Sequence, residues 1–172
     1  MNEYLIRAKH WQIFLSVVLP IVLISSIPEF DFMVLKLKRI IIFTYYWLWV
    51  LILGESIHEC TPRRVSINNN LFKINVAFLI FVHGIAIALM DPNVIYIFSG
   101  YWILIFLYLV VAVIQINYHL GKLLVSTEEK KWVPLKNHFK ESSLFFLGIL
   151  GIFWLQPRLN KIAEQCYEDD EL

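Results

Sequence analysis

Residues of the types that bind metals stand close together in the segment GESIHEC. They are Glu55, His58, Glu59 and Cys60. Carboxylate, imidazole and thiolate groups are the usual ligands of zinc and iron, but a di-iron bundle repeats Glu-x-x-His on two helices and adds two further glutamates. This chain contains Glu-x-x-His once, His138–Glu141 reverses the order, and HExxH is absent. The pattern therefore favours a solvated helix end, and we expect no metal and no cofactor.

His83 lies near the centre of an apolar segment, within FLIFVHGIAIALM. An ionisable side chain at membrane depth is costly and normally faces the interior of a helix bundle or a water-filled cavity. Gly84 and Ala88 beside it form a small-x-x-x-small pair, which allows two helices to approach closely. Two interpretations stay open. His83 is either hydrogen-bonded across a tight helix pair, or it is a polar pore or proton-handling residue.

Gln115 and His119 share one helix face with Lys122 through i+4 and i+7 spacing. Polarity rises toward the end of this apolar segment, so the face has two interpretations. If this end of the helix leaves the membrane, the three side chains form an ordinary solvent-exposed polar face. If helices associate there, Gln115 and His119 line a vestibule and are candidates for buried polar or pore residues.

Basic residues and tryptophans meet where the first and the last apolar segments reach water. Tryptophan is typical of the membrane interface, and Lys and Arg beside it suit lipid phosphates. We expect an interfacial anchor at each end, with contact to a partner protein as the alternative. Pro157 is expected to open a new helix after a bend. The anchor candidates are Arg7, Lys9 and Trp11 near the N-terminus and Trp154, Arg158 and Lys161 near the C-terminus.

Other catalytic or nucleic-acid-binding signatures are missing from the sequence. It contains no Walker loop, no Gly-x-Ser-x-Gly and no Cys–His arrangement of a catalytic kind. The net charge is +1, and no basic patch is interleaved with aromatic residues, so we expect no direct binding of nucleic acid. Cys60 and Cys166 are far apart and form no CxxC pair. We interpret them as two unrelated thiols in a reducing compartment.

The composition indicates a membrane protein. Of the 172 residues, 59% are apolar and 17% are charged, whereas soluble domains average roughly 45–50% and about 25%. Five stretches of 19, 15, 17, 30 and 16 residues contain no Asp, Glu, Lys or Arg. A helix needs about 20 apolar residues to cross the hydrocarbon core. The sequence therefore predicts an all-α integral membrane bundle, with the first apolar segment retained as an uncleaved helix.

The charge-free stretches set the expected element boundaries. The 30-residue stretch exceeds one span, so we expect its C-terminal end to leave the membrane after a tight turn at MDPN. Pro20 is expected to kink the first helix. Residues 1–162 are expected to form one transmembrane domain and residues 163–172 an acidic mobile tail. The expected spans are 11–27, 37–54, 71–90 and 94–118, followed by a short segment at 144–156 that is interfacial, re-entrant or a fifth span.

The distribution of Lys and Arg predicts the orientation, because cytoplasmic loops carry an excess of these residues. With a cytoplasmic N-terminus and five crossings, ten cations lie inside and five outside. If the last segment does not cross, the balance becomes 12 against 3. The rule therefore favours four crossings of the cytoplasmic membrane with both ends inside.

The two ends of the chain carry a family resemblance. RAKHWQIFL near the N-terminus and WLQPRLNKI near the C-terminus resemble a set of small, uncharacterised bacterial multi-helix membrane proteins that begin and finish in this way. The likeness covers about 30 residues and does not extend to the middle of the chain. It implies a shared membrane topology and no activity. The size and helix count are also similar to those of membrane components of prokaryotic phage-defence systems.

These observations predict a non-enzymatic, homo-oligomeric protein of the lipid bilayer that acts by assembly, pore formation or recruitment of a cytoplasmic partner. A chain this small can hardly enclose a channel alone, so a pore would require self-association. Two alternatives remain. One is a membrane-embedded enzyme or metal site built on Glu55, His58, Glu59 and His83, and the other is a monomeric membrane adaptor.

Overall fold

The computed structural model describes residues 10–28, 31–89 and 100–168. Within these ranges the chain forms six helices and no strand. The MDPN turn, the start of the fourth span at 94 and the anchor candidates Arg7 and Lys9 lie outside the described residues. The helices are α2 (His10–Ser25), α3 (Phe32–Glu59), α4 (Asn70–Leu89), α5 (Tyr101–Glu128), α6 (Leu135–Phe146) and α7 (Ile149–Glu168).

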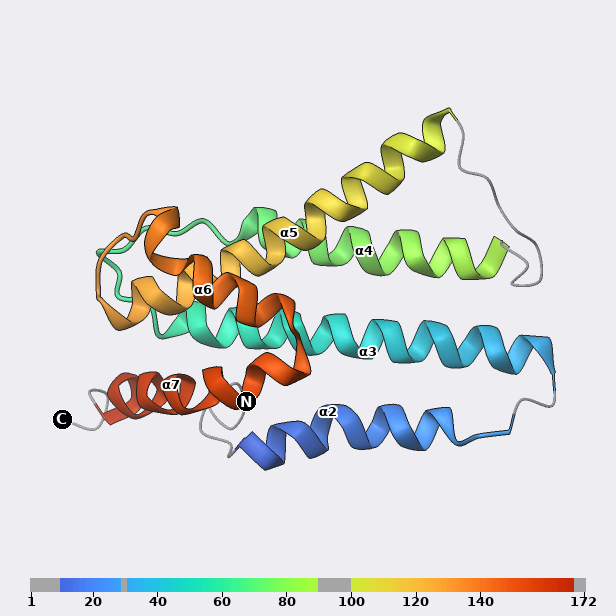
Figure 1. The fold of residues 1–172 in the computed structure, drawn as a ribbon, viewed down its shortest axis with the longest axis horizontal. Coiled ribbons are helices and arrows are strands. Elements are labelled where there is room, and N and C mark those ends of the chain that lie inside the picture. The colour runs from blue at the N-terminus through green and yellow to red at the C-terminus, as the bar shows by residue number, and fades with distance from the viewer. Residues whose placement is uncertain (1–9, 29–30, 90–99, 169–172) are drawn as a thin grey trace.

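The first four helices run up and down along the long axis of the molecule (Figure 1). Helices α2, α3 and α4 lie side by side, and α5 runs obliquely across α4 toward the end of α3. Helices α6 and α7 are grouped around the C-terminal half of α5, at one end of the bundle. We call this end, which also holds the α3–α4 connection, the hairpin end. Helices α6 and α7 together form the C-terminal hairpin.

Among the described helices, three are long and apolar enough to cross a membrane: α3, α4 and α5. The surface of these helices is typical of contact with lipid, because large apolar side chains such as Phe81, Leu104 and Val111 are more than half exposed. Helix α2 is also apolar but has only 16 residues. The expectation of an all-α fold is therefore confirmed for the described residues, and three of their helices are candidate membrane spans.

Several helix boundaries differ from the expected ones. Helix α3 begins five residues before 37 and continues to Glu59, so the segment GESIHEC is largely helical. Helix α5 continues to Glu128, ten residues beyond the expected end at 118. Pro157 lies inside the continuous helix α7 and does not open a new one. Because α7 reaches Glu168, residues 163–168 of the expected mobile tail are helical.

The backbone carbonyl that Pro20 leaves without its helical partner is satisfied by a neighbouring helix. Proline has no N–H, so the carbonyl of Ser16, four residues earlier, receives no intrahelical hydrogen bond. The Tyr45 hydroxyl on α3 donates a hydrogen bond to this Ser16 carbonyl. In an apolar environment an unsatisfied carbonyl costs several kcal/mol. Tyr45 therefore fixes α2 against α3 at the proline.

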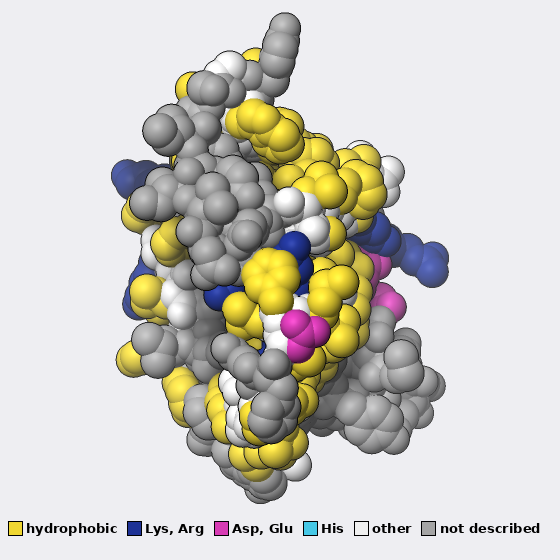
Figure 2. Space-filling view, turned by 90° about the vertical axis from the view of Figure 1, so that its right-hand side faces the viewer, with side chains coloured by type: hydrophobic (Ala, Val, Ile, Leu, Met, Phe, Trp, Pro, Cys, Tyr) yellow, Lys and Arg dark blue, Asp and Glu magenta, His cyan; other side chains and the backbone are white. Residues whose placement is uncertain are grey.

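At the end opposite the hairpin, two lysines cap the C-termini of neighbouring helices. Lys38 Nζ donates to the carbonyls of Ser25 and Ile27, at 3.0 and 2.8 Å, and is buried. Lys36 Nζ donates to the carbonyl of Ala88 at 2.9 Å. A cation at a helix C-terminus is stabilised by the helix dipole. Figure 2, which looks onto this end, shows hydrophobic side chains over much of its described surface, with basic and acidic side chains at the centre and at the edges.

Close packing at the hairpin end depends on Gly121 of α5. A Cβ atom at this position would lie 2.6 Å from the backbone N and 2.8 Å from the Cα of Ser142 on α6. Backbone atoms cannot move aside as the tip of a flexible side chain can, so α5 and α6 must separate to admit a methyl group. Gly84 of α4 is the opposite case, because its Cβ position has nothing within 4 Å.

Replacement of these two glycines by alanine is expected to change the stability of the protein in opposite directions. In a helix, replacing glycine by alanine adds about 1 kcal/mol of stability when space is available. We therefore expect Gly84→Ala to stabilise the protein by up to about 1 kcal/mol and Gly121→Ala to destabilise it by about 1–3 kcal/mol. Thermal unfolding in a detergent that keeps the chains monomeric, followed by circular dichroism, measures both. Stabilisation by Gly121→Ala would contradict the described packing of α5 on α6.

Candidate functional site

A chain of polar side chains joins α4 to α5 within the bundle. The Tyr108 hydroxyl donates to Asn75 Oδ1 at 2.7 Å, and Asn75 Nδ2 donates to Gln115 Oε1 at 2.8 Å. Asn75 is almost fully buried. Hydrogen bonds between transmembrane helices hold them together, each contributing about 0.6–2 kcal/mol. Gln115 therefore has a structural partner, and the geometry matches helix association better than a water-filled pore.

His119 belongs to a second network one turn further along α5. Asn69 Nδ2 donates to Glu55 Oε1, so the other amide atom, Asn69 Oδ1, must accept from His119 Nε2 across 2.7 Å. Lys73 Nζ pairs with the second oxygen of Glu55 at 2.8 Å. The network connects α3, α4 and α5 at the hairpin end and balances the charge of Glu55. His119 is buried and stacked on Phe72, with ring centroids 5.1 Å apart.

The structure does not bring the proposed metal ligands together. Glu55 is engaged by Asn69 and Lys73, whereas His83 stacks on Phe43 of α3 with ring centroids 3.5 Å apart. Among the described residues, no group of three or more His, Cys, Asp or Glu side chains could hold a metal ion. The alternative of a metal site built on Glu55, His58, Glu59 and His83 therefore has no support in the geometry.

The small residues beside His83 face away from the other helices of the chain. The Cβ position of Gly84 is open, and Ala88 is exposed. The expected tight pair at Gly84 and Ala88 is therefore not formed within one chain. His83 itself is half-buried through its stacking on Phe43, and the pair joins α3 to α4 near their middles.

Arg158 ties the C-terminal hairpin to the end of α5. Its Nε donates to Glu128 Oε1 at 2.8 Å and its Nη1 to Glu141 Oε1 at 2.6 Å, and Nη2 pairs with the second oxygen of Glu128. We call these three residues of α7, α5 and α6 the Arg158 clamp. The hydrogen bonds that Arg158 donates to Glu128 are the main cause that raises the pKa of Arg158 above its usual value, although burial opposes it. The guanidinium is therefore permanently charged.

The other C-terminal anchor candidates lie at the surface. Trp154 is 64% exposed and Lys161 is exposed on the same helix, as expected for side chains that meet lipid or headgroups. Helix α2 includes Trp11. Sequence reasoning grouped Arg158 with Lys161 by spacing and missed Glu128 and Glu141, which lie 30 and 17 residues away from Arg158.

Cys60 and Cys166 form a disulfide, so the interpretation as two unrelated thiols is wrong. Their Cα atoms lie 5.4 Å apart, although 106 residues separate them in sequence. Helix α7 runs back along the bundle and brings Cys166 to the residue that follows the end of α3. The bond and the Arg158 clamp are two independent attachments of α7 to the hairpin end.

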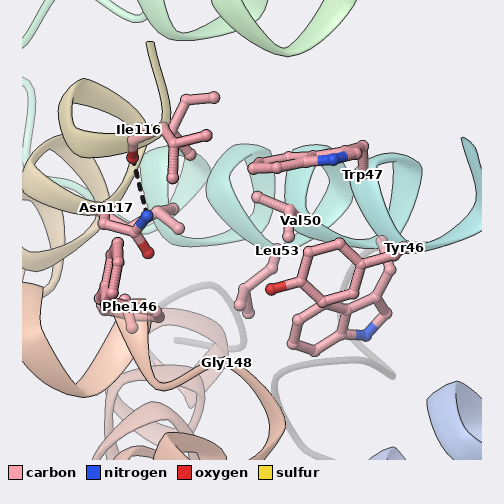
Figure 3. A pocket seen from close by; sticks show the side chains of 12 residues that line it. Tyr46, Trp47, Val50, Leu53, Ile116, Asn117, Phe146 and Gly148 are labelled. Carbon is pink, nitrogen blue, oxygen red and sulfur yellow. Dashed lines mark hydrogen bonds between the residues drawn. The ribbon is translucent and has the colours of Figure 1, made fainter. Parts of the chain in front are cut away.

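An apolar pocket of about 200 Å³ lies between α3, α5 and the turn of the C-terminal hairpin. Figure 3 shows the Tyr46 hydroxyl pointing into it beside Leu53, with Asn117 and Phe146 on the opposite side. Asn117 Nδ2 donates to the Val113 carbonyl at 2.7 Å. Sites for organic cofactors or drug-sized ligands usually measure about 300–1,000 Å³. The pocket is smaller, and its aromatic and aliphatic walls suit a short stretch of hydrocarbon.

Comparison with protein-family models, with curated proteins and with solved structures finds no match to this chain.

Proposed function

We propose that the protein is a non-enzymatic, multi-pass protein of the cytoplasmic membrane that acts by self-association and by recruiting a cytoplasmic partner to its hairpin end. Four helices, α2 to α5, cross the bilayer in this proposal, and both termini face the cytoplasm. The observation that carries it is the segregation of charge along the bundle. Ten described cations belong to the hairpin end, from Arg63 to Lys161, whereas the opposite end has Lys36, Lys38 and Arg39.

The fold supports four crossings because the C-terminal hairpin turns back instead of crossing. The turn falls at Leu147 and Gly148, where Gly148 adopts a left-handed φ of +59°. A Cβ atom on Gly148 would lie 3.2 Å from the hydroxyl of Tyr46, which stands near the middle of α3. We infer a re-entrant hairpin that enters from the cytoplasmic side, reaches about half the depth of α3 and returns.

The open face of α4 supports self-association. Gly84 and Ala88 leave room for another helix to approach closely, and none of the described helices of the same chain occupies this room. In lipid, helix association depends on such close packing and on interhelical polar contacts, because burying apolar surface gives no advantage there. His83 lies beside this face, and a second copy of the chain packed against the face would cover this polar side chain.

The test of this proposal is the oligomeric state of a Gly84→Leu variant. In mild detergent we expect the wild-type protein to have a multiple of the monomer mass, measured by size-exclusion chromatography with light scattering. Gly84→Leu is expected to release monomers, because the leucine fills the approach surface. The fold of each chain is expected to remain intact, since the site is open within one chain.

The matched control is Ile85→Leu, one residue further along the same helix at an exposed position. This change conserves side-chain volume, so the oligomer is expected to persist. A monomeric wild-type protein, or a Gly84→Leu protein that assembles as the wild type does, would exclude self-association through this face. The monomeric adaptor would then be the better proposal.

The biological setting is proposed from the size and helix count of the chain, which are similar to those of membrane components of prokaryotic phage-defence systems. Membrane components of phage-defence systems act at the bilayer, and a self-associating protein of this size fits such a role. We propose expression in a bacterial host followed by phage plating as the assay of this setting. Protection by the wild type and loss of protection by Gly84→Leu would connect the role to assembly.

A further inference from the structure

A polar cavity opens at the hairpin end, away from the apolar pocket. It has a volume of about 410 Å³ and lies between the end of α3 with its following loop, the end of α5 and the last turns of α7. Three cations line it, Arg63, Arg64 and Lys130, together with the hydroxyl-bearing Thr61 and Thr127. Glu59 is the acidic side chain among its described lining residues.

The walls of this cavity are held in place on two sides. The hydroxyls of Thr61 and Thr127 are 2.8 Å apart and connect the loop after α3 to the end of α5. The disulfide between Cys60 and Cys166 connects the same loop to α7. Both threonines and both cysteines are lining residues. In the oxidised protein the three elements therefore present their charges around one fixed opening, which lowers the entropy cost of binding a ligand.

The three cations of the cavity have no partners among the described residues, and the same holds for Lys136, Lys140 and Lys161 of the hairpin end. Arg158 and Lys73 pair with carboxylates, and Lys122 lies over the ring of Trp132. Within the described part of the chain, Arg63, Arg64 and Lys130 form no side-chain hydrogen bond or ion pair. Among the described lining residues, three cations therefore stand against the single carboxylate of Glu59.

Lys130 also has a backbone conformation that favours glycine. It follows the last residues of α5 with a φ of +52°, and its N–H donates to the Thr127 carbonyl at 3.3 Å. A helix that ends in this left-handed conformation usually has glycine there, because a side chain is strained. A non-glycine residue kept in such a conformation points to a use for its side chain.

We propose that this cavity binds a phosphate-bearing anion. Arginine guanidinium groups form paired hydrogen bonds with phosphate oxygens, and a lysine adds a point charge. The phosphate belongs either to an anionic lipid headgroup at the membrane surface or to a soluble phosphate compound. The site does not depend on self-association, because all of its residues come from one chain.

The experiment uses the full-length, oxidised protein and two probes. Binding of inorganic pyrophosphate in an uncharged detergent is measured by calorimetry, and retention of phosphatidylglycerol is measured by native mass spectrometry. We expect the wild type to bind at least one probe. Pyrophosphate binding identifies a soluble phosphate compound as the ligand, and selective retention of one phosphatidylglycerol identifies the lipid.

The decisive variant is Lys130→Gly, because it separates binding from stability. Glycine relieves the backbone strain, so the unfolding temperature is expected to stay the same or to rise. Binding of the probe is expected to weaken about tenfold or more through loss of one charge-assisted contact. Arg64→Gln is expected to weaken binding similarly. Lys140→Gln on α6, an exposed position outside the cavity, is the control with the same change in net charge.

Two results would overturn the proposal. One is a wild-type protein that binds neither probe, and the other is a Lys130→Gly protein that binds as tightly as the wild type. Equal weakening by Lys140→Gln would also count against it, since binding would then follow the net charge of the protein and not this cavity.

Discussion

Replacing Arg158 by methionine is expected to lower the free energy of unfolding by about 3 kcal/mol, because it leaves two carboxylates without their partner. Glu141 is buried and Glu128 is only partly exposed. Both currently accept hydrogen bonds from the guanidinium, and Glu141 does so at 2.6 Å. Methionine conserves much of the packing of the arginine stem. The free energy of unfolding, measured by denaturant titration in detergent, gives the size of the effect.

Lys161→Met is the matched control on the same helix. Lys161 is exposed, and a surface charge of this kind contributes about 0–1 kcal/mol. The triple variant Arg158→Met with Glu128→Gln and Glu141→Gln is expected to regain part of the lost stability, since neutral amides are less costly to bury than unpaired charges. Equal effects of Arg158→Met and Lys161→Met would mean that the Arg158 clamp is not a stabilising contact.

Reduction of the disulfide is expected to lower the free energy of unfolding by about 2–4 kcal/mol. The bond joins residues that are 106 positions apart. Closing so long a loop restricts the unfolded chain strongly, and the chain-entropy model gives about 4.7 kcal/mol for 100 residues. The expected value is smaller because detergent-denatured membrane proteins keep part of their helical structure, which already limits the unfolded state.

The measurement compares unfolding with and without dithiothreitol, monitored by circular dichroism. The double variant Cys60→Ser with Cys166→Ser serves as the control and is expected to show no response to the reductant. Limited proteolysis is expected to cut α7 earlier in the reduced protein, since one of its two attachments is lost. Unchanged stability and unchanged proteolysis after reduction would show that the bond does not support the hairpin.

The proposed topology has a consequence for this disulfide in cells. It places the hairpin end in the cytoplasm, where thiols are kept reduced and disulfides are mainly transient or redox-sensing. Acid quenching followed by maleimide labelling is expected to find both thiols reduced in resting cells. A fully formed bond in resting cells would place this end in an oxidising compartment and reverse the orientation.

Much of the architecture followed from hydrophobicity and charge alone. The long uncharged segments specify helices in lipid, because only a helix satisfies its own backbone hydrogen bonds there. Four of the six helices therefore lie close to their expected places, although α3 and α5 extend further than their apolar portions. The polar residues Gln115 and His119 in the C-terminal half of α5 could also be recognised from the sequence. The partners of these two side chains, on α4 and in the loop before α4, could not.

The tight glycine contacts illustrate why the site could not be predicted in full. Sequence reasoning selected Gly84 and Ala88 because small residues four apart are typical of close helix pairs. In the fold, Gly121 makes the close approach and Gly84 is open within the chain. Small residues permit close contact on any helix face, and only the arrangement of the helices decides which face has a neighbour.

The sequence by itself determined that the chain is helical, that its apolar segments are long enough to cross a membrane, and that its cations are concentrated at one end. These properties depend on the local balance between side chains and lipid, which each segment carries independently. The tertiary structure alone decided that Arg158 meets Glu128 and Glu141, that Cys60 bonds to Cys166, and that Lys130 faces a cavity. Those contacts join residues that are distant in sequence, and their formation depends on where the C-terminal hairpin turns and packs.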